Sequence, residues 1–249
     1  MRVPKRIRFG VALVLALAGI VALATGCTPT ESAAPGAAPT GACAHPYFPV
    51  RKGATWVYQT RDAGRTVDTV SDVRPDGFTL ARKLGDARSN ERWTCTAAGL
   101  RRADQLPQDL LAGSYDTRWN TERLEGLDLA RALAPRAHWR LELVVRTSTR
   151  APGAAEWQRR MTSDHFFLAG ATERVTVPAG TFDAVPVRET ITRSLERPTG
   201  DNPAPTTIET TTWWARGVGW IKRRSQRIRP VPGPEVLTEL VSSSEARRQ

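Results

Sequence analysis

The chain has 249 residues, a hydrophobic content of 40% and a formal net charge of +11. This is enough apolar material for a folded core in one domain or two small ones. The three histidines and three cysteines show no spacing typical of metal ligands. We therefore expect no metal and no other cofactor.

Residues 1–26 have the organisation of an export signal. A basic tip precedes an apolar run of 16 residues from Phe9 to Ala24. A membrane-spanning helix needs about 20 residues, which argues against a retained anchor helix. The segment LATGC ending at Cys27 resembles the bacterial lipobox, in which the cysteine is acylated. Ala22-Leu23-Ala24 also fits an ordinary A-x-A cleavage site, which would release a soluble secreted protein.

Residues 27–42 are expected to form a disordered tether. From Thr28 onwards they include no aromatic and no branched aliphatic residue, so they cannot bury enough apolar surface to fold. Export followed by acylation predicts a protein held to the cell membrane through a lipid on Cys27. Thr28 lacks the acidic character of inner-membrane retention signals, which favours the outer membrane where a cell has one. An exported protein is not expected to bind nucleic acid, despite its positive charge.

The two remaining cysteines are Cys43 and Cys95. If Cys27 is acylated, these two are left as a pair in an oxidising compartment, where disulfides form. A disulfide would connect the start of the domain to a strand near Trp93. The alternative is two free thiols.

Residues 43–244 read as a mainly β domain, and residues 245–249 as a frayed tail. β-branched and aromatic residues alternate between turn signals throughout. The expected strands cover residues 55–60, 66–74, 78–80, 90–96, 100–104, 139–146, 157–167, 173–177, 182–195, 206–214, 220–228 and 236–241. Within 121–135, Leu124, Leu127 and Ala130 recur at helical spacing after a possible N-cap at Thr121, which predicts a helix. The predicted fold is an antiparallel meander forming an open or half β-barrel with one or two short helices.

Three segments carry a family resemblance: YFPVRKGATWVY at 47–58, VTVPAGTF at 175–182 and WWARGVGWIKR at 213–223. Together they resemble a widespread group of bacterial exported lipoproteins whose activity is not established. That group is similar to the open half-barrels of Lol-type lipoprotein carriers. The resemblance implies a curved sheet around an apolar cavity beneath a helical lid, and it implies no catalytic residues.

The aromatic residues of these segments have two interpretations. Trp56, Tyr58, Trp213, Trp214 and Trp220 either fill a core or line a cavity for an apolar ligand. The corresponding hypotheses are a protein that binds lipid or envelope polymer, and an interaction module with a solid core. The sequence indicates no oligomeric state.

Catalysis is not expected, because the common nucleophile, phosphate-loop and zinc-protease motifs are missing. Asp164 and His165 are adjacent on a strand, so their side chains should point to opposite faces. Asp68 and Asp72 are predicted to share one solvated face. The basic run that begins at Lys222 is predicted to form a solvated sheet edge.

Overall fold

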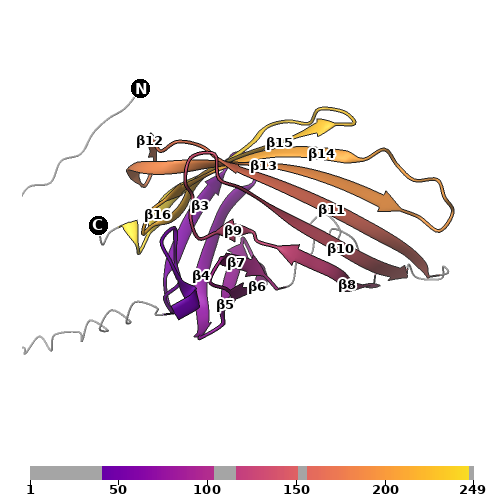
Figure 1. Ribbon diagram of the computed structural model, residues 1–249, viewed down its shortest axis with the longest axis horizontal. Helices are drawn as coiled ribbons and strands as arrows, with labels where there is room; N and C mark the ends of the chain where they lie inside the picture. Colours follow the sequence, from indigo (N-terminus) through magenta and orange to yellow (C-terminus); the bar gives the residue numbers. More distant parts are fainter. Residues whose placement is uncertain (1–40, 104–115, 151–155, 247–249) are drawn as a thin grey trace, which may run out of the picture. The chain divides into compact units, whose positions relative to one another are not determined.

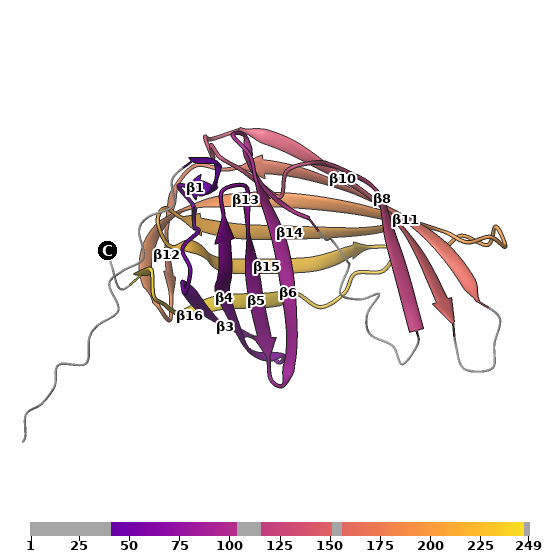
Figure 2. The same ribbon diagram turned by 90° about the horizontal axis from the view of Figure 1, so that it is seen from below.

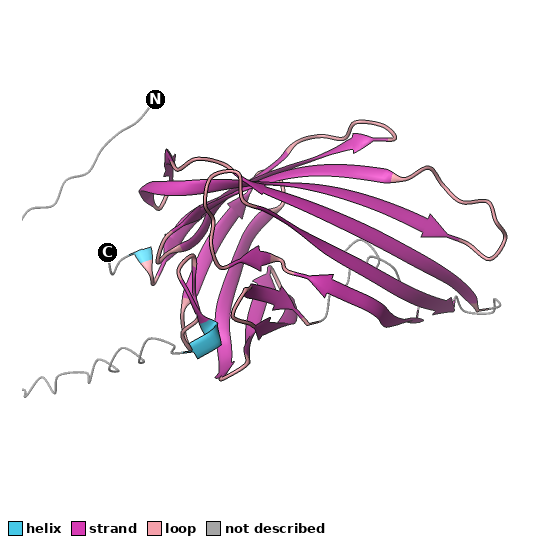
Figure 3. Cartoon of the chain, viewed as in Figure 1, coloured by secondary structure: helices cyan, strands magenta, loops and turns pink. Residues whose placement is uncertain are grey.

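The structure, a computed structural model, describes residues 41–103, 116–150 and 156–246, and its regular structure is almost entirely β-strand (Figures 1 and 3). A 3-10 turn, η1 (Gly41–Cys43), leads into the first strand. The strands are β1 (Ala44–His45), β2 (Phe48–Pro49), β3 (Thr55–Thr60), β4 (Gly64–Arg74), β5 (Gly77–Leu84), β6 (Ala87–Cys95), β7 (Gly99–Arg102), β8 (Asp116–Gly126), β9 (Leu129–Ala130), β10 (His138–Arg150), β11 (Trp157–Ala169), β12 (Glu173–Val177), β13 (Gly180–Glu196), β14 (Thr206–Ala215), β15 (Gly219–Arg229) and β16 (Val236–Ser243). The prediction of a mainly β domain is confirmed.

Fourteen of these strands form one antiparallel sheet, while β1 pairs with β2 separately. The order is β8-β10-β11-β13-β14-β15-β16-β3-β4-β5-β6-β7-β9, with β12 paired to β13. Most neighbours in the sheet are close neighbours in sequence, as in a meander, and Figures 1 and 2 show β13, β14 and β15 side by side. β16 pairs with β3 and thereby joins the part of the sheet that contains β10–β16 to the part that contains β3–β7. The sheet is not closed into a barrel, so the predicted open sheet is confirmed.

The helix predicted within residues 121–135 is wrong. This stretch forms β8 and β9, which lie at opposite ends of the strand order. β8 pairs with β10 as far as Gly126, and β9 pairs with β7. Between them, the N–H of Asp128 donates to the carbonyl of Leu100 over 3.0 Å. One short stretch of chain therefore contacts both ends of the sheet. The described ranges contain no α-helix, so they do not provide the helical lid that the resemblance implies.

Gly126 supplies the physical reason for this difference. Its φ of +100° is far from the helical value, and a Cβ at this position would lie 2.0 Å from the carbonyl oxygen of Arg140. Leu124, which the periodicity assigned to a helix face, instead lies opposite Leu143 of β10. Pairing with a distant strand outweighs a weak helix propensity.

Strand alternation gives the sheet two chemically different faces. We call the face that carries the buried apolar residues the core face, and the opposite one the outer face. The largest fully buried side chains of the core face include Trp56, Tyr58, Phe78 and Leu100, from β3, β5 and β7. Full burial of each such side chain contributes about 1.5–3 kcal/mol. The main core therefore lies where β3–β7 meet β13 and β14.

A second apolar cluster lies further along β10 and β11 and is separate from the main core. It consists of Leu143, Val145 and Met161, with Leu124 and Leu195 partly buried against it. Val145 is opposite Met161, which in turn is opposite Leu195, so this cluster belongs to the core face.

The prediction that Asp68 and Asp72 share a solvated face is wrong. The register of β4 against β5 shifts between Val70 and Asp72. Such a bulge inserts one residue and turns the following side chains to the other face. Asp68 consequently lies on the core face and is 2% exposed, whereas Asp72 is exposed.

The sequence predicted that the basic run beginning at Lys222 forms a sheet edge. The first residues of this run do not lie at an edge. β15 pairs with β14 on one side and, from Lys222 to Ser225, with β16 on the other. Alternation directs Lys222 and Arg224 to the outer face and Arg223 and Arg227 to the core face. Arg223 and Arg227 therefore share a face with the core, although both remain exposed to water.

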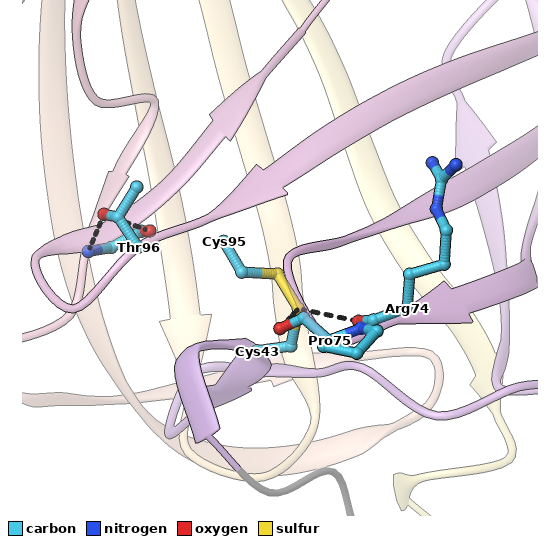
Figure 4. Close-up of a disulfide and its surroundings, with 6 residues drawn as sticks. Cys43, Arg74, Pro75, Cys95 and Thr96 are labelled. Atoms are coloured by element: carbon cyan, nitrogen blue, oxygen red, sulfur yellow. Dashed lines mark hydrogen bonds between the residues drawn. A yellow bond between two sulfur atoms is a disulfide. The ribbon is translucent and has the colours of Figure 1, made fainter.

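The two ends of the domain are fastened by side chains. Cys43 and Cys95 form a disulfide with a Cα–Cα distance of 5.0 Å, which joins η1 to the end of β6 (Figure 4). Their predicted pairing is confirmed. At the other end, Glu245 is buried and forms an ion pair with Arg51. The folded part thus extends beyond Ser244 into the tail that was expected to fray.

Candidate functional site

Four of the five aromatic residues proposed to line a cavity come together in the main core. Trp56, Tyr58, Trp214 and Trp220 are each at most 8% exposed. The indole N–H of Trp56 donates to the carbonyl of Val218 over 2.5 Å. The rings of Tyr58 and Trp220 stack with centroids 3.6 Å apart and an interplanar angle of 3°. Burial also raises the pKa of Tyr58 well above its ordinary value, so it stays a neutral phenol.

Trp213 is placed differently, because alternation along β14 turns it to the outer face. It is half-buried, and its indole N–H donates to the carboxylate of Glu173. The ammonium of Lys222 lies 5.8 Å from its ring centroid. Trp213 thus contacts charged groups on the outer face, while part of its side chain packs against the main core.

A buried polar group divides the two apolar regions of the core face. The hydroxyl of Ser163 lies 2.9 Å from Nε2 of His165, and Nδ1 of His165 lies 2.7 Å from a carboxylate oxygen of Glu189. The natural assignment is that Nδ1–H donates to Glu189 and that Nε2 accepts from Ser163. Ser163 is 0% exposed and His165 8%. Asp164 is exposed on the other face, in agreement with the sequence prediction.

This connectivity is that of a serine–histidine–acid catalytic group, but the surroundings do not support catalysis. Nucleophilic attack requires an exposed hydroxyl beside free donors for the oxyanion. Ser163 is fully buried, and its strand pairs with β10 and β13 on both sides. The three side chains satisfy one another's hydrogen-bonding needs, as buried polar groups generally do.

A second polar network on the core face is centred on Arg82 of β5. Its Nε and Nη2 each donate to one oxygen of Asp68 over 2.8 Å, and Nη1 donates to Glu91 over 2.7 Å. Burial disfavours the guanidinium charge, but the two carboxylates outweigh this and raise the pKa of Arg82. Arg82 therefore connects β4, β5 and β6 through charge-assisted hydrogen bonds.

Arg102 and Arg223 are two further charged residues of the core face. Arg102 pairs with Asp128, with 2.8 Å between Nη2 and Oδ1. Arg223 has a different environment: its Nε donates to the hydroxyl of Thr212 over 3.2 Å, and its guanidinium lies 4.8 Å from the ring centroid of Trp220. Arg223 as a whole is exposed to water, but the protein around its guanidinium partly desolvates the charge. This desolvation, opposed by Glu189 and assisted by Arg82 and Arg102, lowers the pKa of Arg223.

Charge is distributed unequally between the two faces of β11, β13, β14 and β15, whose residues are all described. Cations of the outer face meet carboxylates in the pairs Arg160–Glu122, Arg160–Glu196, Lys222–Glu239 and Arg224–Glu235. Register places Arg159, Arg193, Arg223 and Arg227 on the core face of these strands, together with the carboxylate of Glu189. The core face of this region is therefore basic.

His45 is the buried titratable group that ties β1 to β9. Its Nδ1 accepts from the N–H of Tyr47 over 3.2 Å, and Nε2 lies 3.2 Å from the carbonyl of Ala130, so Nε2 carries the proton. This arrangement fits the neutral ring. Burial, opposed by the bond to Ala130 and assisted by Arg131, lowers the pKa of His45 from 6.5 to about 4.

The domain is accordingly expected to lose stability on acidification through His45. Between pH 6.5 and 4 the unfolded chain binds a proton that the folded chain does not, so the stability present above pH 6.5 declines as the pH falls. The loss is about 3 kcal/mol. Urea unfolding at pH 7, 5.5 and 4.5 measures this loss. The free energy of unfolding of His45→Gln should depend less on pH than that of the wild type, whereas that of His138→Gln, at an exposed histidine, should not change in this way. Equal pH dependence in all three proteins would contradict the assignment.

The charged networks were missed by the sequence analysis, although part of the signal was present. Ser163 and His165 are two residues apart on one strand and so share a face, but only the adjacent Asp164 was considered. Nothing local indicates Glu189, Arg82 or their partners, because these contacts depend on register.

Cys27, the predicted acylation site, lies outside the described residues. Over the described ranges, no helix has the length and apolar character needed to span a membrane. In the same part of the chain, no three His, Cys, Asp or Glu side chains gather as a metal site would require.

Fold and site together define an open antiparallel β-sheet protein with a charged, water-accessible region on its core face. No protein-family model matches the chain, and no curated sequence is significantly similar to it. It is similar to the solved structure of a protein from Bacteroides fragilis NCTC 9343 assigned as exported with a YmcC-like fold, at 13% identity and a TM-score of 0.48. A protein assigned as a lipoprotein from Parabacteroides distasonis ATCC 8503 has 17% identity and a TM-score of 0.48. Each match covers 80% of this chain and 98% of the other. A likeness of this degree carries no inference about activity, ligand or partner.

Proposed function

We propose that this chain is an exported lipoprotein that binds an amphiphilic molecule on the core face of β8, β10, β11 and β13. Beside the second apolar cluster, whose three central residues are at most 2% exposed, the same face carries the half-buried Trp157, Ile191 and Ile208 and the 46% exposed Trp119 of β8. These partly open side chains are the observation that carries this proposal. Apolar side chains that remain partly open to water favour a binding surface over a filled core.

The proposal of a lipid anchor on Cys27 comes from the sequence. The Cys43–Cys95 disulfide is compatible with the export that such an anchor requires. Acylation at Cys27 would hold the domain to the membrane through the tether of residues 27–42. Cys43–Cys95 is a bond expected in an oxidising compartment, where exported proteins reside. Thr28 favours the outer membrane in a cell that has one.

Metabolic labelling with palmitate tests the anchor. Cys27→Ser is expected to abolish the label and to release the protein from the membrane fraction, because this thiol is the proposed acyl acceptor. Retained label on the variant would contradict acylation at Cys27. An unlabelled wild type cleaved after Ala24 would instead identify a soluble secreted protein.

The role proposed is binding and not catalysis, because the group with catalytic connectivity found among the described residues is buried in the sheet. Ser163 offers no exposed hydroxyl to a substrate. The four aromatic residues of the main core, Trp56, Tyr58, Trp214 and Trp220, would border the binding region as packed walls.

Fluorescence titration with dansyl-undecanoic acid, an amphiphilic probe, tests the function. We expect saturable binding by the wild type and loss of most of it in Trp119→Asp, which puts a carboxylate beside the apolar surface. Phe166→Asp is the matched control, since Phe166 is 39% exposed on the outer face. Absence of probe binding, or equal effects of the two variants, would contradict the proposal. Mass spectrometry of an organic extract of purified protein would then identify the natural ligand.

The outer face supports a second candidate function, an interaction module of the cell envelope. Phe166 and Leu168 are 39% and 37% exposed on neighbouring outward positions of β11, and the Arg140 guanidinium lies 5.8 Å from the Phe166 ring centroid. An apolar pair beside a cation suits a protein or polymer surface. Probe binding lost in Phe166→Asp and kept in Trp119→Asp would favour this candidate.

A further inference from the structure

Arg223 differs from the other two arginines of the charged region in having hydrogen-bond donors to spare. Its Nε is occupied by Thr212, and Trp220 covers one side of the guanidinium. Among the described residues, its terminal Nη groups meet no hydrogen-bond acceptor and no carboxylate. These groups can form a planar fork that matches the two oxygens of a carboxylate or phosphate.

The acids that surround Arg223 are already used by other cations. Asp68 and Glu91 bind Arg82, and Asp128 binds Arg102. Glu189, which faces Arg223 from β13, binds His165. Desolvation by the surrounding protein lowers the pKa of Arg223, Glu189 opposes this, and repulsion from Arg82 and Arg102 adds to it. An external oxyanion would relieve this repulsion.

The register places an apolar surface on the same face as Arg223, four residues further along the strands. Arg223 lies opposite Thr212; four residues further along β15, Arg227 lies opposite Ile208, which is itself opposite Ile191. Ile191 lies opposite His165 of β11, whose strand also carries Met161 of the second apolar cluster. A molecule with a charged end at Arg223 could therefore place an apolar end on this surface.

We propose that Arg223 binds the oxyanionic headgroup of a single-chain anionic lipid whose acyl chain lies over the half-buried Ile208 and Ile191 of the core face. This inference rests on the proposed function, which it deepens by naming the ligand class. Thr212 and Trp220 hold the guanidinium in position, and the remaining basic residues of the core face, Arg159 and Arg227, favour the approach of an anion. A cationic amphiphile would be excluded by the same charges.

Isothermal titration calorimetry of the purified protein with oleoyl-lysophosphatidate, monooleoylglycerol and inorganic phosphate tests the inference. We expect lysophosphatidate to bind more tightly than the neutral lipid. Arg223→Gln should weaken lysophosphatidate binding roughly 10- to 100-fold, the effect of losing charge-assisted hydrogen bonds, and should leave the neutral lipid unaffected. Arg223→Lys should show an intermediate loss, because it keeps the charge without the fork.

Arg224→Gln is the matched control, because it removes the same charge from the adjacent outer-face position, where Arg224 contacts Glu235. It should bind both lipids as the wild type does, and unchanged thermal midpoints would show that each variant folds. Equal lysophosphatidate binding by wild type and Arg223→Gln, with the neutral lipid still bound, would overturn the Arg223 site and leave the proposed function standing. Failure of both lipids to bind the wild type would overturn both. Displacement of lysophosphatidate by millimolar phosphate would identify a site for free phosphate and overturn the lipid assignment.

Discussion

Replacing Arg82 by Met is expected to lower the free energy of unfolding by about 3–5 kcal/mol, because removal of one partner leaves a buried charge uncompensated. Asp68, its bidentate partner, is 2% exposed and cannot turn to water. Glu91, the second partner, would then face Asp68 as a like charge. Equilibrium urea unfolding of the purified protein measures the effect.

Two variants make this expectation specific. Arg224→Met removes the same side chain from an exposed pair with Glu235, whose two members are 54% and 47% exposed, and should cost at most about 1 kcal/mol. The double variant Asp68→Leu/Arg82→Met removes both partners and should recover part of the loss. Equal costs for Arg82→Met and Arg224→Met would show that the core-face network contributes no more than a surface pair.

The double variant Cys43→Ser/Cys95→Ser is expected to lose about 4 kcal/mol of stability in the chain-entropy description of a disulfide. The bond closes a loop between residues separated by 52 positions, and its removal restores conformational freedom to the unfolded chain. It also joins the segment containing Phe48 to β6, where Phe48 stacks on Phe78 and Trp93 with centroids 5.3 and 5.8 Å apart.

Urea unfolding with and without reductant distinguishes the disulfide from the packing around it. Reductant should lower the unfolding midpoint of the wild type and leave the double variant unchanged, because only the wild type has a bond to break. A wild-type midpoint that is insensitive to complete reduction, verified by thiol titration, would contradict this expectation.

Strand positions could be predicted from the sequence because alternation and turn residues are local signals. β3 and β12 begin and end at the predicted residues, and the other strands that were predicted lie within about four residues of their expected bounds, whereas β1, β2, β8 and β9 were not predicted. The wrong helix prediction at residues 121–135 has the same origin. The helical spacing of a few leucines is also a local signal, whereas the availability of the β10 edge for pairing cannot be read from neighbouring residues. Pairing with that edge, assisted by the positive φ of Gly126, decides the structure there.

The candidate site was less accessible to sequence reasoning, because its contacts join residues distant in the chain. Asp68 meets Arg82 only because β4 and β5 pair in one register, and the bulge after Val70 decides which aspartate of β4 is buried. Ser163 and His165 are recognisable as neighbours on one face, but their partner Glu189 comes from β13.

By itself, the sequence determined the export-signal pattern, the β-rich character of the domain and the composition of its strands, since these depend on runs of neighbouring residues. Only the tertiary structure decided which face each charge occupies and which charges meet. A strand has two faces that alternate residue by residue, so a single bulge or a shift of one position exchanges core and solvent. The position of Arg223 on the core face, one residue from Arg224 on the outer face, is the consequence that matters most for function.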